Sequence, residues 1–559
     1  IVRFLVQNSL GRLWVLNNPT SPLADQMEYF VKPDPDSCED FRQISSPEEI
    51  TLIDPACGSG HFLCHAFDLL AAMYEERGYR RRDIPQLILE KNLTGIEIDR
   101  RAAALTSFAL TMKACEWDGR FLRRGVAPRV MCLESVVLTP EEREAIGAGP
   151  EDQTLVDVLA HLGEVGSLWH PTSEDVAALG KWSERATGEA GLFAGMVTEK
   201  LACAQKYVQA LSSTSLICAT NPPYMGGGNL APWMSGWVRS SYPDEKADLC
   251  TCFIKRGFSL ASSDGYNAQV TMQSWMFLGS FQKMRKEIIA NKGIATMAHL
   301  GARAFDAIGG EVVQTTATVF ANTSSANKGI YLRLVGERGE GEKEQALKTG
   351  VANLACVWCH EANVEDFKSV PGWPIAYWIG EGMRSAFREG TPMSVNGHPK
   401  KGLTTTDNNH FLRAWREVSL MRICTNAGDR NQALLSRARW FPYDKGGDFR
   451  KWYGNRDYVL NWENDGELIK GCISSKCNGG SYTKEIRSEA LYFSKSITWT
   501  ELSTGMPAFR YSPCGTLFDS SGSSMFPASH LFYYLGLMNS SVMVEILKML
   551  NPTLHYNSG

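Results

Sequence analysis

Short apolar runs alternate with amphipathic helical stretches through the first 325 residues of the chain. The runs show no polar alternation, which is typical of strands that are buried on both faces of a parallel sheet. Alternation of such strands with helices predicts a doubly wound α/β sheet. The seven candidate strands are Ile50–Ile53, Leu93–Asp99, Arg129–Leu133, Leu216–Ala219, Ala268–Met272, Ile294–Leu300 and Val312–Phe320.

Changes in this pattern predict the domain organisation. Residues 1–48 are helical and then turn-rich, and we interpret them as the end of an N-terminal helical region. Residues 49–325 carry the sheet, interrupted at 138–212 by a polar, helical insertion without a strand-like run. Residues 326–400 contain two turn-rich breaks and are expected to connect to a separate, mixed and β-rich module at 401–559, where aromatic residues and short strands accumulate.

Composition limits the class of protein. A chain of 559 residues is too long for one hydrophobic core. No apolar run approaches the length of a membrane span, and no signal segment opens the chain, so we expect a cytoplasmic protein without a membrane partner. The fifteen cysteines are odd in number and scattered through apolar segments, which favours reduced thiols. Both ends look cut, and we expect a piece of a longer protein.

Two cysteine patterns suggest metal chemistry without establishing it. Cys356-Val-Trp-Cys359-His360 matches a haem-attachment pattern, and Cys472 with Cys477 could complete a zinc site. The four cysteines are unequally spaced, and buried thiols in a strand explain the first pair more simply. We therefore predict no metal site.

A glycine-rich turn follows the first predicted strand, in the segment Asp54–Gly60. Strand, glycine turn and helix open many nucleotide-binding units. The third glycine of the dinucleotide fingerprint and the Gly-Lys-Ser of a phosphate loop are both missing. What remains is a turn that a ligand can approach closely, with an acid, Asp54, suited to a cationic group such as an ammonium. Glu97, at the end of the second strand, is suitably placed to accept the hydroxyls of a ribose.

The strongest chemical signal is the tetrad Asn221-Pro222-Pro223-Tyr224, which directly follows a predicted strand. Ligands of parallel sheets bind just beyond the carboxyl ends of the strands. Two prolines stiffen the loop, so that the Asn221 side chain and the Pro222 carbonyl are two fixed acceptors beside an aromatic ring. Such a group suits an exocyclic amine on a flat base. The alternative is an ordinary strand-to-loop exit, since Asn and Pro are common turn residues.

Three motifs in the order 54–60, 95–99 and 221–224 (Asp-Pro-Ala-Cys-Gly-Ser-Gly, Gly-Ile-Glu-Ile-Asp and Asn-Pro-Pro-Tyr) resemble the S-adenosylmethionine-dependent N6-adenine DNA methyltransferases. This resemblance implies a Rossmann-like methyltransferase sheet followed by a target-recognition module. Finer similarity is to the PglX family, the methyltransferases of BREX phage-defence systems, and lies in segments 8–14, 221–227, 273–278, 309–314, 440–443 and 550–554.

The resemblance also implies roles for individual residues. S-adenosylmethionine would be bound by Asp54, Pro55, Ala56, Cys57, Gly58, Gly60, Glu97, Ile98, Glu134, Asn221 and Asp248. The glycine turn would line its methionine side, Glu97 would hold the ribose and Ile98 would pack on the adenine. Glu134 stands where the family commonly has Asp. The catalytic residues would be Asn221, Pro222, Pro223 and Tyr224, with Tyr224 stacking on a flipped adenine.

The implied partners are double-stranded DNA and other proteins of the defence system. The net charge of −4 means that DNA would be met by local basic clusters, such as Arg100–Arg101 or Arg450–Lys451. The leading hypothesis is a site-specific adenine methyltransferase that marks host DNA. The alternative is a recognition subunit that binds DNA and cofactor but methylates only with its partners. Methylation of RNA or of protein glutamine also uses Asn-Pro-Pro-Tyr, and the large C-terminal module favours DNA.

Overall fold

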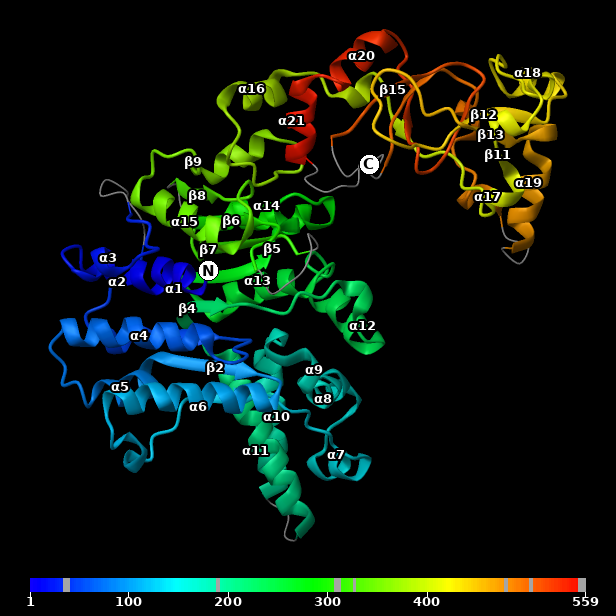
Figure 1. Cartoon of the computed structure of the whole chain (residues 1–559). Helices are drawn as coiled ribbons and strands as arrows, with labels where there is room; N and C mark the ends of the chain where they lie inside the picture. Colours follow the sequence, from blue (N-terminus) through cyan, green and yellow to red (C-terminus); the bar gives the residue numbers. More distant parts are fainter. Residues whose placement is uncertain are drawn as a thin grey trace. The chain divides into compact units, whose positions relative to one another are not determined.

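The computed structural model describes residues 1–33, 41–187, 192–305, 313–324, 328–476, 481–501 and 506–550. Cys477 and most of the segments 309–314 and 550–554 lie outside these residues. The chain divides into two compact units, Ile1–Gly380 and Glu381–Gly559 (Figure 1). Among the helices that the described residues form, none is both long and apolar enough to cross a bilayer.

The first unit is built on a nine-stranded sheet with the order β3-β2-β1-β4-β5-β7-β6-β8-β9. The five neighbouring strands β3, β2, β1, β4 and β5 run parallel to one another, whereas β7 lies antiparallel between β5 and β6. The α/β class with a large central sheet is thus confirmed. The strands are β1 (Leu52–Asp54), β2 (Leu93–Glu97), β3 (Val130–Cys132), β4 (Ser215–Thr220), β5 (Ala261–Met272), β6 (Gly293–Gly301), β7 (Thr315–Ala321), β8 (Gly329–Arg333) and β9 (Cys359–Ala362).

The predicted number of seven strands is too low. All seven predicted runs contribute strands, and β8 and β9 add two more from the segment 326–400, which the sequence pattern assigned to a connector. Between them runs a helix, α15 (Gly339–Ala352), which has a glycine-rich and charged sequence. It packs nonetheless, because Lys343 is buried with its ammonium donating to the carbonyls of Leu300 and Leu334, each at 2.7 Å. The charged sequence of α15 therefore led to the prediction of a connector where the structure has a packed helix.

Helices cover both faces of the sheet. In β1, Leu52 joins the hydrophobic cluster with α1 and α4, whereas Ile53 joins the cluster with α11 and α13. In β4, Ile217 and Cys218 divide in the same way. This division follows from the alternation of side chains along a strand. The helices of the first unit are α1 (Val2–Val6), α2 (Arg12–Asn17), α3 (Leu23–Gln26), α4 (His61–Glu76), α5 (Ile84–Leu87), α6 (Arg100–Trp117), α7 (Pro140–Ile146), α8 (Gln153–Ala160), α9 (Leu162–Val165), α10 (Ser173–Thr187), α11 (Leu192–Ser212), α12 (Pro232–Ser241), α13 (Leu249–Leu260), α14 (Gln282–Asn291) and α15.

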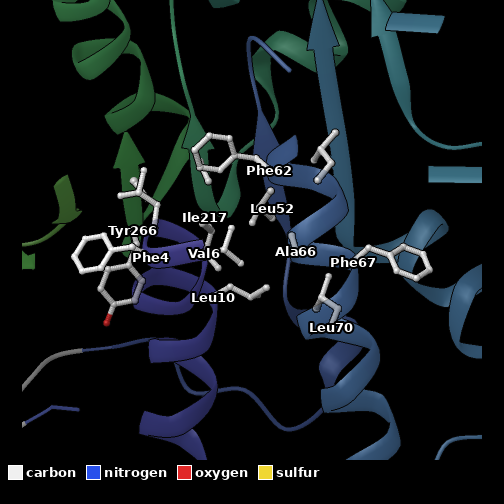
Figure 2. Close-up of a cluster of buried hydrophobic side chains, with 14 of the residues drawn as sticks. Phe4, Val6, Leu10, Leu52, Phe62, Ala66, Phe67, Leu70, Ile217 and Tyr266 are labelled. Carbon is white, nitrogen blue, oxygen red and sulfur yellow. The ribbon is translucent and has the colours of Figure 1, made fainter. Parts of the chain in front are cut away.

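The first of these clusters joins the N-terminal segment to the sheet. The π-helical turn η1 (Gln7–Gly11) continues α1, and both pack beside α4, with α1 against β5 and β7 and η1 against β5 (Figure 2). The side chains that meet there are Phe4, Val6, Leu10, Leu52, Phe62, Ala66, Phe67, Leu70, Ile217 and Tyr266. Residues from the predicted N-terminal region are therefore part of the core of the sheet domain.

The second unit contains two small sheets: an antiparallel one of order β10-β17-β14-β15 and a mixed one of order β11-β13-β12-β16, in which β12 and β16 run parallel. Their strands are β10 (Pro399–Lys400), β11 (Leu412–Ala414), β12 (Trp440–Asp444), β13 (Tyr458–Asn461), β14 (Ser496–Thr498), β15 (Arg510–Ser512), β16 (Leu517–Phe518) and β17 (Ser524–Met525). The helices are α16 (Glu381–Glu389), α17 (Asn408–Phe411), α18 (Arg430–Leu435), α19 (Glu463–Lys476), α20 (Leu531–Met538) and α21 (Ser541–Leu550). Two separate hydrophobic clusters hold this unit together.

The burial of β1 predicts the effect of truncating its side chains. We expect Leu52→Ala to lower the free energy of unfolding of the first unit by about 2–5 kcal/mol, because a fully buried leucine leaves a cavity. The control is Leu122→Ala, at a leucine that is 73% exposed, which should change it by less than about 0.5 kcal/mol. Urea titrations followed by tryptophan fluorescence measure both. Equal effects would contradict the assignment of β1 to the core.

Candidate functional site

The predicted site residues meet at one edge of the sheet. Strand β1 lies parallel between β2 and β4, with Leu52 opposite both Leu93 and Ile217, and β3 lies parallel to β2. The carboxyl ends of the four strands therefore lie side by side. Asp54 ends β1, Glu97 ends β2, Glu134 follows β3 and Asn221 follows β4.

The glycine turn after β1 packs against α6 on one side and has open space beside Gly58 on the other. Gly58 and Gly60 both have positive φ, at 52° and 85°, where residues with a side chain are strained. A Cβ on Gly60 would lie 2.9 Å from Thr106 Cγ2 of α6, and the Thr106 hydroxyl donates to the Gly58 carbonyl at 2.7 Å. A Cβ on Gly58 would meet no atom within 4 Å. A ligand can therefore approach the backbone at Gly58 while Thr106 supports the turn from behind.

The first residues of this segment are largely buried. Asp54 is 1% exposed, and Pro55 and Cys57 are also buried. The Cys57 backbone N–H donates to the Ile96 carbonyl at 3.0 Å, and burial raises the pKa of the Cys57 thiol. Cys57 thus serves packing and not nucleophilic chemistry.

Asp54 is a buried acid with a perturbed pKa. Burial raises the pKa of its carboxyl to about 7, and the charge of Glu97 contributes to the rise. The backbone N–H of Ala56 donates to Asp54 Oδ1 at 3.1 Å and opposes it. Because a nearby cation favours the charged form of a carboxyl, a positively charged ligand at this edge would ionise Asp54 and be held by it.

Glu97 ties the glycine turn to the end of β2. Its Oε2 accepts the backbone N–H of Gly58 at 2.8 Å, and its Oε1 accepts those of Ile98 and Asp99 at 2.8 and 3.1 Å. A carboxylate offers about four acceptor positions, so one remains beyond these three hydrogen bonds. Glu97 can therefore hold the two loops together and still accept a ligand hydroxyl.

Glu134 is already engaged by a neighbour. The guanidinium of Arg100, at the start of α6, binds its two carboxylate oxygens with Nε and Nη2. This hydrogen-bonded ion pair lowers the pKa of the Glu134 carboxyl. Glu134 lies at the expected edge, and its arginine partner is a neighbour that sequence spacing did not indicate.

The tetrad after β4 has one internal hydrogen bond. Asn221 and Pro223 are exposed, whereas Pro222 is buried and Tyr224 packs partly against the hydrophobic cluster on one face of the sheet. The Tyr224 hydroxyl donates to Asn221 Oδ1 at 3.0 Å. A carbonyl oxygen has two lone pairs, so Asn221 Oδ1 keeps one acceptor position while its orientation is fixed.

Asp248 is connected to the loop that follows the tetrad. Gly226 and Asp248 form an antiparallel bridge, and the Leu249 N–H donates to the Met225 carbonyl at 3.0 Å. Asp248 also caps α13, since its Oδ1 accepts the Cys250 N–H at 3.0 Å. The N-terminus of α13 and the tetrad loop therefore form one unit.

A turn of the insertion also reaches the site. This turn, η6 (Gly166–Leu168), touches the half-exposed Ile98, because a Cβ on Gly166 would lie 2.9 Å from Ile98 Cγ2. The Ser167 hydroxyl donates to the carbonyl of Pro55. Sequence reasoning missed Ser167 and Thr106, since neither lies in a motif and both make contacts distant in sequence.

Within the described part of the chain, no group of three or more His, Cys, Asp or Glu side chains is arranged to hold a metal ion. Cys356 and Cys359 are free thiols. Of the other two cysteines of the zinc hypothesis, Cys472 is a free thiol and Cys477 lies outside the described residues.

Two family models match the two parts of this site. Residues 39–134 match the MmeI DNA-methyltransferase domain, and residues 217–305 match the Eco57I restriction-modification methylase. The whole chain is 38% identical to the adenine-specific methyltransferase BrxX of Escherichia coli O9:H4 (strain HS). It is 37% identical to the adenine-specific methyltransferase PglX of Lacticaseibacillus casei (strain Zhang). The resemblance to the PglX methyltransferases is confirmed.

The chain spans about half the length of these PglX relatives, 48% in each case, while 100% of the chain is matched. Among solved structures, the fold resembles that of the type IIL restriction-modification enzyme MmeI in complex with DNA. The TM-score is 0.51 at 14% identity, and the match covers 96% of this chain and 63% of MmeI. This likeness supports the fold.

The raised pKa of Asp54 has a consequence for stability. Because its folded-state pKa, about 7, exceeds the ordinary value of 3.8, the group stabilises the fold at low pH, and this stabilisation is lost as the pH rises through 7. We expect the wild type to lose up to about 4 kcal/mol between pH 4 and 8 relative to Asp54→Asn, at about 1.4 kcal/mol per pKa unit. Urea titrations at several pH values measure the difference, and parallel pH profiles would contradict it.

Proposed function

We propose that the chain contains the catalytic part of a site-specific DNA methyltransferase that transfers a methyl group from S-adenosylmethionine to N6 of adenine. The observation that carries this proposal is the fixed acceptor Asn221 Oδ1, at the same sheet edge as the glycine turn and the acids Asp54 and Glu97. The names of the PglX relatives agree with it. By analogy with them we propose that the full-length protein marks host DNA in a phage-defence system.

The residues at this edge fit the proposed methyl donor. The open space in front of Gly58 admits a ligand, the buried Asp54 suits its ammonium, and the free acceptor position of Glu97 suits a ribose hydroxyl. Ile98 is 46% exposed and offers an apolar surface to the adenine ring. When bound, S-adenosylmethionine supplies a methyl group activated by a sulfonium. In our proposal Glu134 and Asp248 border this pocket while keeping their bonds to Arg100 and to the α13 N-terminus.

In this proposal the tetrad compensates for the weak nucleophilicity of the adenine amine. The N6 lone pair is conjugated into the ring, so the amine is a weak nucleophile. Asn221 Oδ1 and the Pro222 carbonyl accept its two hydrogens, which favours a pyramidal nitrogen and stabilises the positive charge that develops there. Pro223 stiffens this loop. Tyr224 offers its ring to the base, which offsets part of the few kcal/mol needed to extrude it from the duplex.

For the second unit we propose a role in target recognition. Phe449, Trp452 and Tyr453 each expose more than half of their surface, beside the exposed Arg450. Aromatic rings and cations together suit the bases and phosphates of nucleic acid.

The decisive experiment is methylation-aware sequencing of DNA from cells that carry the full-length gene. N6-methyladenine at one motif, absent with an Asn221→Ala gene, would establish the activity and name its target. A mark that requires neighbouring genes would support the recognition-subunit alternative. Absence of the mark in every strain would overturn the proposed activity.

Removal of the fixed acceptor should separate chemistry from binding. We expect Asn221→Ala to lower the rate of methyl transfer at least about 100-fold, as loss of a preorganised group in an active site does. The dissociation constant of S-adenosylmethionine, measured by calorimetry, should change little. Asn291→Ala, at an exposed asparagine of α14, is the matched control. Retained transfer in Asn221→Ala would refute the assigned role.

The hydrogen bond within the tetrad can be tested separately. Tyr224→Phe keeps the ring but releases the Asn221 amide, so we expect kcat to fall about tenfold, the effect of one lost hydrogen bond of about 1.4 kcal/mol. Affinity for the methyl donor should remain that of the wild type. An unchanged kcat would mean that Asn221 is oriented without the hydroxyl.

A further inference from the structure

The η6 turn of the insertion is held by two buried side chains from a later part of the chain. Arg256 of α13 is 1% exposed, and its Nε donates to the Ser167 carbonyl at 2.7 Å. The Tyr242 hydroxyl, just after α12, donates to the Leu168 carbonyl at 2.5 Å. Two successive carbonyls of one short turn are thus fixed from α13 and from the end of α12.

Arg256 joins further elements around this turn. Its Nη2 donates to the Leu211 carbonyl at the end of α11, and its Nη1 donates to the Ser259 hydroxyl one turn along α13, at 2.5 and 2.7 Å. A buried guanidinium is costly unless its donors are satisfied. Burial lowers the pKa of Arg256 to about 10, so the group remains charged at neutral pH. Its hydrogen bonds hold the insertion in one position on the sheet domain.

The same turn supports both sides of the proposed cofactor site. The Ser167 hydroxyl donates to the carbonyl of Pro55, near the start of the glycine turn, and Gly166 lies against Ile98. Gly166 has φ of 57°, and any side chain there would displace Ile98. The opposite end of α13 carries Asp248, which is bridged to the tetrad loop at Gly226. Helix α13 therefore connects the tetrad loop to η6, the turn that supports the glycine turn.

We propose that Ser167 is a positioning residue for the methyl donor. Held by Arg256, it fixes Pro55 through its hydroxyl, and together with Gly166 it keeps the cofactor loop and Ile98 in the geometry that receives the donor. The inference rests on the proposed function, and it gives the insertion a part in cofactor binding. Ser167 touches neither reacting atom, so its effect is on affinity for the donor and not on the chemical step.

The test compares the alanine variants of two serines, each of which lacks the hydroxyl oxygen. Ser167→Ala removes the hydrogen bond to the Pro55 carbonyl. Ser259→Ala removes a hydrogen bond to Arg256, which also binds the Ser167 carbonyl, but leaves the hydrogen bond between Ser167 and Pro55 in place. We expect Ser167→Ala to raise the dissociation constant of S-adenosylmethionine about five- to tenfold by calorimetry, the usual effect of one buried hydrogen bond. Ser167→Thr keeps a hydroxyl and should restore most of the affinity, and Ser259→Ala should bind like the wild type.

Steady-state kinetics on the same variants provide a second measurement. The KM for the donor should rise in Ser167→Ala while kcat and the KM for DNA stay unchanged. Gly166→Ala should also weaken donor binding, through Ile98. Equal affinity of Ser167→Ala and the wild type would overturn the inference, as would equal weakening by Ser259→Ala. If the wild type binds no donor, the proposed function fails and the inference with it. If the donor binds but no DNA is methylated, only the proposed reaction is overturned.

Discussion

Strand β1 is the constraint on which both the core and the candidate site depend. It is three residues long, and all three are buried. Leu52 and Ile53 point into the two layers on opposite faces of the sheet, and backbone pairing to β2 and β4 fixes their register. The same register places Asp54 at the edge where the neighbouring strands end. The packing of Leu52 and Ile53 therefore also determines the position of the Asp54 carboxyl.

Polar groups at this edge are stabilised by backbone contacts more than by opposite charges. Glu97 accepts three backbone N–H groups, and Asp54 accepts one from Ala56. These bonds orient the carboxylates without neutralising them, except at Glu134, where Arg100 supplies the counter-charge. Among the described residues no cation is bonded to the carboxyls of Asp54 and Glu97, and two neighbouring acids of this kind favour a cationic ligand. Burial, together with the charge of Glu97, raises the pKa of Asp54 to about 7.

Much of this edge could be predicted from the sequence, because local patterns specify it. The apolar runs predicted the strands, and a motif lies at the end of each of β1, β2 and β4, so that parallel pairing alone brings Asp54, Glu97 and Asn221 together. The missed features are those that local patterns do not encode. The charged sequence of α15 concealed its packed lysine, Lys343. Ser167 bonds to a residue 112 positions away, and such a contact depends on the folded path of the insertion.

That path is itself constrained by the sheet. Strands β3 and β4 both run in the direction of β1, so the connection between them leaves at the edge with the candidate site and must return to the opposite edge. The return is made by α11, whose 21 residues span roughly 32 Å, enough to cross the length of the strands. The turn η6 lies before this return and contacts the site edge at Pro55 and Ile98. In this chain the insertion presents η6 to the glycine turn, and the buried guanidinium of Arg256 holds η6 there.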